Sequence, residues 1–100
     1  MNKFVVIVLD EATKQQGDAL TELLRLTGFV WWHWFQDIWL VPAVADSITP
    51  KLMYDAIMGV EVLKKANVLV LFFDSPPTYF GQAPPDSWKW FEHTGAKVSN

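Results

Sequence analysis

Apolar, strand-favouring runs alternate along the chain with stretches of helical periodicity. Residues 4–9 are continuously apolar and mostly β-branched, which predicts a strand that is covered on both faces and central in its sheet. Thr13 followed by Gln16 forms a capping box, and leucines at helical spacing follow it until Gly28 supplies a stop signal. We therefore expect the first helix to run from about residue 14 to about residue 27.

Two aromatic-rich runs come next. Residues 29–35 and 38–41 are both β-prone, and the polar pair Gln36 and Asp37 separates them, which predicts a hairpin. Pro42 is expected to end its second strand. Because Gln-Asp is not a favoured two-residue turn pair, the hairpin register is less well specified than the hairpin itself.

The second half of the domain repeats the helix-then-strand order. Thr49 can cap a helix that has Pro50 at its first position, and Ile48 can pack as a staple against Met53. Residues 67–73 are again apolar and are followed by turn-forming residues, which predicts a fourth strand.

The resulting order is β-α-β-β-α-β, the ferredoxin-like α+β arrangement, with the first and third strands central and both helices on one face. We assign residues 1–77 to this domain and residues 78–100 to a Trp-rich C-terminal extension that packs on the domain or on a partner subunit. The path of this extension is left open.

The strands do not alternate between apolar and polar residues. Two helices cover only one face of a four-stranded sheet, so the other face of a monomer would ordinarily carry polar side chains. A second copy or the extension is therefore expected to cover that face, and we favour a two-fold homodimer. The predicted interface residues are Trp31, Trp32, Trp34, Phe35, Trp39, Phe72, Phe73, Trp88 and Trp90.

The composition of the chain argues against several classes of function. The chain has 100 residues, of which 51% are hydrophobic, including six Trp, and it contains no Cys. A formal charge of -3 makes nucleic acid an unfavoured partner, because phosphate binding depends on Lys and Arg. Without Cys there is neither a disulfide nor a thiolate metal site. We expect a cytoplasmic protein with no membrane association, no signal peptide and no bound cofactor.

Part of the chain resembles a known family. The string GFVWWHWFQDIWLVPAVADSITPKLMYDAI, followed by NVLVLFF and a late Trp, is similar to the SinR-family proteins, small relatives of the nuclease-like smaller subunit of the CRISPR adaptation complex. The resemblance covers about two-thirds of the chain. It implies a ferredoxin-like homodimer and a link to defence against mobile DNA. In the CRISPR relatives an Asp directly after the first strand faces its two-fold mate as a proposed Mg²⁺ ligand, and Asp10 matches that position.

Each residue that could act as a metal ligand or a catalytic group also has a purely structural interpretation. Asp10 could hold Mg²⁺ together with Asp10 of a second copy, and Glu11 and Asp37 could join it at the same rim of the sheet. The alternative is that Asp10 is a solvated loop residue. His33 has no metal-ligand partner at a suitable spacing, so a hydrogen-bonded structural role is favoured.

We conclude from the sequence that the chain is a non-catalytic homodimeric interaction or regulatory module, with no assigned catalytic residue and a further protein partner left open. The alternative is a metal-dependent nuclease or nucleic-acid-binding protein that uses Asp10 at the dimer two-fold, with Mg²⁺ as its cofactor. A small-molecule enzyme or sensor is a third class, for which no acid-base pair is evident.

Overall fold

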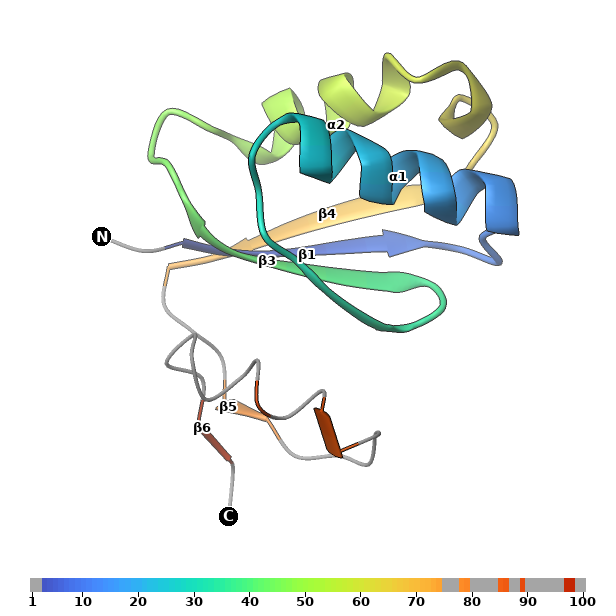
Figure 1. Ribbon diagram of the computed structural model, residues 1–100. Helices are drawn as coiled ribbons and strands as arrows, with labels where there is room; N and C mark the ends of the chain where they lie inside the picture. Colours follow the sequence, from blue (N-terminus) through green and yellow to red (C-terminus); the bar gives the residue numbers. More distant parts are fainter. Residues whose placement is uncertain (1–2, 75–77, 80–84, 87–88, 90–96, 99–100) are drawn as a thin grey trace.

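Two helices lie on one face of a four-stranded antiparallel sheet (Figure 1). The computed structural model describes residues 3–74, 78–79, 85–86, 89 and 97–98. Its elements are β1 (Lys3–Leu9), α1 (Lys14–Leu26), β2 (Trp32–Phe35), β3 (Ile38–Val44), α2 (Pro50–Met58), the short 3₁₀-helix η1 (Glu61–Leu63), β4 (Val68–Phe73), β5 (Thr78–Tyr79) and β6 (Lys97–Val98).

The strand order β2-β3-β1-β4 places the first and third strands at the centre of the sheet. This order, with every neighbouring pair antiparallel, is compatible with the ferredoxin-like arrangement predicted from the sequence. β5 and β6 form a separate two-stranded parallel sheet, which lies on the side of the main sheet away from the helices (Figure 1). No helix in the described part of the chain has the length and apolar character needed to cross a membrane.

The predicted helix starts are confirmed. The Thr13 hydroxyl accepts a hydrogen bond from the backbone N–H of Gln16 at 3.1 Å, and the Gln16 side chain accepts one from the Thr13 N–H at the same distance. These two bonds satisfy donors that a helix leaves unpaired at its start. α1 ends at Leu26, and Gly28 follows with φ +83°, a conformation that glycine adopts without steric cost. Thr49 caps α2 by accepting from the N–H of Leu52 at 3.1 Å.

The main core lies between the helices and the sheet. Leucines of α1 and apolar residues of α2 and η1 pack against alternate residues of β1 and β3, as amphipathic helices on a sheet require. Between the helices and the sheet, the core side chains with no more than 1% of their surface exposed are Val5, Ile7, Leu9, Leu20, Leu24, Trp39, Val41, Val44, Ile57 and Leu63. Phe4 is also only 1% exposed, on the opposite side of the sheet.

The hairpin differs from the prediction at both ends. β2 begins at Trp32 rather than at residue 29, and β3 continues through Pro42 to Val44. Pro42 is tolerated because β2 pairs no further along β3 than Leu40, so beyond that point β3 has β1 as its one neighbour in the sheet. A proline, which lacks a backbone N–H, fits a strand where one edge is unpaired.

Candidate functional site

The side of the sheet turned away from α1 and α2 is lined entirely by apolar residues. Strand register places alternate residues of β1, β3 and β4 on this side, together with two residues of β2. We call this surface the helix-free face. It consists of Phe4, Val6, Val8, Trp32, Phe35, Ile38, Leu40, Pro42, Leu69, Leu71 and Phe73.

Exposure on the helix-free face is greatest along β4. Leu69 is 53% exposed, and Leu71 and Phe73 are each 42% exposed. On the opposite edge Phe35 is 43% exposed, whereas Trp32 is buried and meets the Phe35 ring edge-on at 5.1 Å between ring centroids. Single exposed apolar residues are ordinary on a protein surface, but a continuous set of this kind marks an interaction surface.

The two edges of the sheet also differ. β2 has four residues and an irregular register against β3 between Trp32 and Phe35. β4 has six residues, contains neither a charge nor a proline, and pairs in regular register with β1 alone. Short, bulged edges discourage pairing with other chains, and long apolar edges favour it. The β4 side is therefore the more exposed and the less protected part of the helix-free face.

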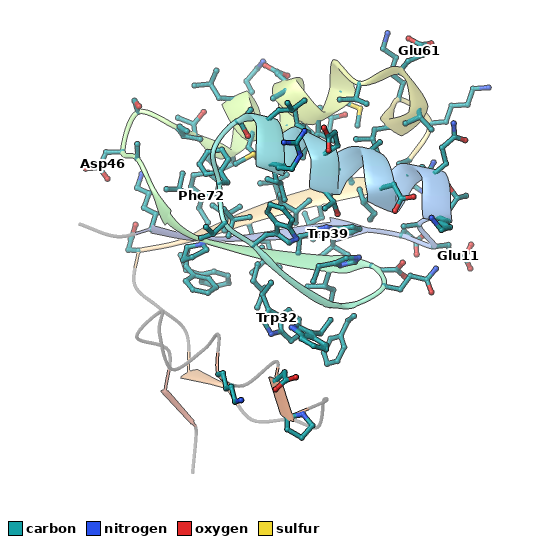
Figure 2. All side chains as sticks on the ribbon, viewed as in Figure 1. Glu11, Trp32, Trp39, Asp46, Glu61 and Phe72 are labelled. Carbon is teal, nitrogen blue, oxygen red and sulfur yellow. The ribbon has the colours of Figure 1, made fainter. Side chains whose placement is uncertain are left out.

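The predicted interface residues divide between the two sides of the sheet. Trp32, Phe35 and Phe73 lie on the helix-free face, and Trp34 is 45% exposed on β2. Trp39 instead has no exposed surface and lies on the helix side of the sheet (Figure 2). Trp31 and Phe72 pack against the same helix-side core. Trp88 and Trp90 lie outside the described residues.

An irregularity in β2 explains why Phe35 lies on the same side as Trp32. The sequence pattern, read with strict alternation, puts Trp31 and Phe35 on one side and Trp32 and Trp34 on the other. The register shift between Trp32 and Phe35 brings these two residues to the same side, opposite Leu40 and Ile38 respectively. A bulge inserts one extra residue and so reverses the alternation beyond it.

The acidic residues at the end of β1 have separate positions. Asp10 and Glu11 are exposed, and the Asp10 backbone N–H donates to the carbonyl of Asn67 at 3.0 Å. Asp37 is half-buried, and its carboxylate accepts the N–H of buried Ala12 at 3.1 Å. Within the described ranges no three His, Cys, Asp or Glu side chains are grouped closely enough to hold a metal ion. A Mg²⁺ site shared by Asp10 of two copies requires the second copy and stays a prediction.

The turn of the hairpin holds the loop between β1 and α1. The Gln36 side chain donates to the carbonyl of Ala12 at 2.9 Å, so both main-chain groups of Ala12 bind side chains of this turn. The preceding residue, Glu11, has φ +50°, which costs free energy for a residue other than glycine. This tertiary role accounts for a Gln-Asp pair in a turn where local preference alone favours other residues.

His33 is hydrogen-bonded on the helix side of the sheet. Its Nδ1 lies 3.0 Å from the carbonyl oxygen of Ile38, and its ring stacks on Trp39 with 3.9 Å between centroids and 8° between planes. The Trp39 indole N–H in turn donates to the Thr21 hydroxyl at 3.1 Å. Sequence reasoning did not single out Thr21, because nothing in a helical pattern shows which strand residue a polar helix side chain will meet.

Comparison with protein-family models, with curated proteins and with solved structures gives no match for this chain. The resemblance to the SinR family therefore stays a prediction.

Proposed function

We propose that this chain is a non-catalytic homodimeric interaction module in which two copies pack together through their helix-free faces. The observation that carries the proposal is the exposure of Leu69, Leu71 and Phe73 side by side on β4, on a face whose other strand residues are also apolar. Covering apolar surface contributes about 25 cal/mol per Å², so water is an unfavourable neighbour for this surface.

A second copy of the chain is the occupant that best fits the chemistry of the face. A two-fold axis brings the same patch of each protomer into contact. Because no side chain of the helix-free face carries a charge, two such faces meet without like-charge repulsion. A strongly charged partner would find no complementary group there. The net charge of -3 then remains on the outer surfaces of the dimer.

The non-catalytic part of the proposal rests on how the reactive side chains are used. Asp37 is bonded to the main chain of the β1–α1 loop, and His33 is bonded to Ile38 and stacked on Trp39. Both residues therefore have structural roles that explain their positions. Exposed Asp10 is left as the candidate for the alternative, a metal-dependent nuclease formed at the dimer two-fold.

Light scattering on the purified protein tests the dimer. We expect the wild type to be dimeric at micromolar concentration and Leu71→Asp to be monomeric, because the new carboxylate would be buried against its own copy. Leu52→Asp is the matched control, since Leu52 is 55% exposed on α2, on the other side of the sheet, and this variant should stay dimeric. A monomeric wild type, or equal loss of the dimer in both variants, would overturn the proposal.

A second assay addresses the alternative. Labelled RNA and DNA are incubated with the protein in Mg²⁺ or Mn²⁺, in parallel with Asp10→Ala. Metal-dependent cleavage by the wild type that is lost in Asp10→Ala would show that the module is an enzyme. We expect no cleavage by either protein.

A further inference from the structure

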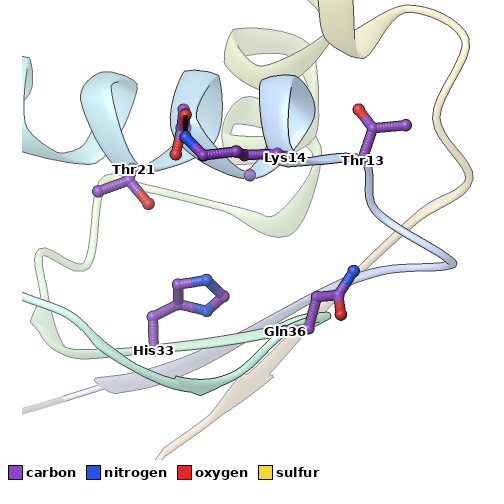
Figure 3. Close-up of a pocket in the computed structure, with 7 residues that line it drawn as sticks. Thr13, Lys14, Thr21, His33 and Gln36 are labelled. Carbon is purple, nitrogen blue, oxygen red and sulfur yellow. Dashed lines mark hydrogen bonds and ion pairs between the residues drawn. The ribbon is translucent and has the colours of Figure 1, made fainter.

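A groove lined mainly by residues with polar side chains lies between α1 and β2, on the helix side of the sheet and away from the helix-free face (Figure 3). Its volume is about 380 Å³, near the lower end of the range for small-molecule sites. One wall is a single side of α1 and the other is formed by β2 and the hairpin turn. The groove is lined by Thr13, Lys14, Gly17, Asp18, Thr21, His33 and Gln36.

The charges on the α1 wall compensate each other. The Lys14 ammonium group lies 2.8 Å from the Asp18 carboxylate, and this contact, mainly its hydrogen bond, raises the pKa of Lys14. No other ionic side chain lines the groove. An anion entering the groove would meet a cation that is already paired and a nearby carboxylate. The lining therefore favours a ligand without net charge.

The opposite wall presents a fixed hydrogen-bond acceptor. Because the Ile38 carbonyl oxygen can only accept, Nδ1 of His33 is the donor in this bond, and the tautomer that makes it carries the ring's lone pair on Nε2. Nε2 has no hydrogen-bond partner among the described residues. Stacking on Trp39 and the bond from Trp39 to Thr21 fix the ring in place, so this acceptor is pre-oriented before any ligand arrives.

The groove also has hydroxyl and amide groups that can form further hydrogen bonds. The Thr13 and Thr21 oxygens accept from the Gln16 N–H and the Trp39 indole respectively, which leaves each O–H able to donate. Gln36 uses one amide N–H on Ala12 and retains a second donor and its carbonyl oxygen. A ligand here needs several groups that both donate and accept.

Gly17 lies in the α1 wall between these groups. Glycine is an unfavourable residue inside a helix, so its presence at this position needs an explanation. A Cβ at this position would lie 3.7 and 3.8 Å from two Trp39 ring carbons, which is ordinary van der Waals contact, so packing does not require glycine here. A longer side chain at position 17 would take up space in the groove. Glycine at position 17 therefore leaves this part of the groove open.

We propose that the groove binds a small uncharged polyhydroxyl compound of monosaccharide size. Each sugar hydroxyl donates and accepts, which matches the mixed lining, and the His33 ring supplies an aromatic surface for the apolar C–H groups of such a ligand. An apolar ligand would strip water from these polar groups without replacing its hydrogen bonds. This inference does not depend on dimerisation, because the groove and the helix-free face are on opposite sides of the sheet.

NMR titration of the isotope-labelled full chain tests the proposal, with D-glucose, D-galactose, D-mannose and D-ribose as separate probes. We expect at least one probe to shift the Trp39 indole N–H signal and the α1 amide signals saturably, with half-saturation at about 1–10 mM. Gly17→Leu, which fills the groove, should weaken this binding about tenfold or more. Gln15→Leu adds the same side chain at an exposed position of α1 and should leave it unchanged.

A second variant protects the test against misfolding of Gly17→Leu. His33→Phe keeps a ring beside Trp39 and removes Nε2, and it should also weaken binding about tenfold or more. The absence of saturable shifts with all four sugars would overturn the proposal. Equal binding by wild type and both groove variants would also overturn it, as would saturable shifts of the same signals by inorganic phosphate but by none of the sugars.

Discussion

The two faces of the main sheet are made of the same kinds of residue but have different surroundings. On β1 the side chains of Val5, Ile7 and Leu9 point to the helices and have no exposed surface. Their neighbours Val6 and Val8 point the other way and are half-buried. The helix side is closed by leucines of α1, whereas neither α1 nor α2 covers the helix-free face (Figure 1).

This difference shows that apolar content alone does not identify the core. By sequence alone, both faces of the sheet have the composition of a core. The position of the helices determines which face is the core. An apolar face that α1 and α2 leave uncovered, and whose β4 residues are exposed, has the character of an interface. The difference between the two faces can be tested by substituting neighbouring residues of one strand. Such residues lie on opposite faces of the sheet but are otherwise alike.

The largest effect is expected from the pair Val5→Ala and Val6→Ala. Both changes remove two methyl groups at adjacent positions of β1. Val5→Ala should lower the free energy of unfolding by about 2–4 kcal/mol, because it leaves a cavity in a closed core. Val6→Ala should cost about 1 kcal/mol or less in the monomer. Urea unfolding monitored by circular dichroism measures both values.

Protein concentration adds a check on the same pair. If the helix-free face is the dimer contact, the cost of Val6→Ala should increase with protein concentration, and the cost of Val5→Ala should not. Equal costs at every concentration would show that the two faces are equivalent, contrary to their different exposure.

A smaller effect is expected at the end of β1, where the sequence pattern grouped three carboxylates, those of Asp10, Glu11 and Asp37. Asp37→Ala should lower the free energy of unfolding by about 1–2 kcal/mol, because it leaves the N–H of buried Ala12 without its acceptor. Asp10→Ala should change it by no more than about 0.5 kcal/mol, since Asp10 is exposed. Asp37→Asn, which keeps an acceptor oxygen, is the control and should recover most of the loss. A larger effect at Asp10 than at Asp37 would contradict this assignment.

The smallest effect is expected on the outer surface of α1. The hydrogen bond from Arg25 lowers the pKa of Glu22 below its ordinary value of 4.5. The pair therefore stabilises the folded chain at pH values above the ordinary pKa of a glutamate. This contribution is lost as the pH falls through the lowered pKa. Thermal unfolding of Glu22→Gln should show a slightly lower midpoint than wild type at neutral pH and the same midpoint in strong acid. High salt should also remove the difference, because the pair is exposed.

Much of the fold could be predicted because its signals are local. The Thr13 capping box, the Thr49 cap with Pro50, and the apolar runs of β1 and β4 act over a few residues, and the structure confirms each of these elements. The 3₁₀-helix η1 and the passage of β3 through Pro42 could not be predicted in this way. The second of these depends on where β2 stops, which is a property of the pairing and not of the residues around the proline.

The candidate sites were less predictable because they join distant segments. Aromatic residues of β2 were expected at an interface, but the bulge that brings Phe35 to the same side as Trp32 has no clear sequence signal. Ala12 and Asp37 are 25 residues apart, and Thr21 and Trp39 are 18 residues apart. Such contacts require the whole sheet and its helices to be in place.

By itself the sequence determined the order of the two long helices and the four strands of the main sheet, and the apolar character of both sides of that sheet, because periodicity and capping are properties of short segments. The tertiary structure alone decided which side the helices cover, which aromatic residues are core, and which polar side chains line the groove beside α1. Packing and strand register, unlike helix or strand preference, depend on residues that are far apart in the chain.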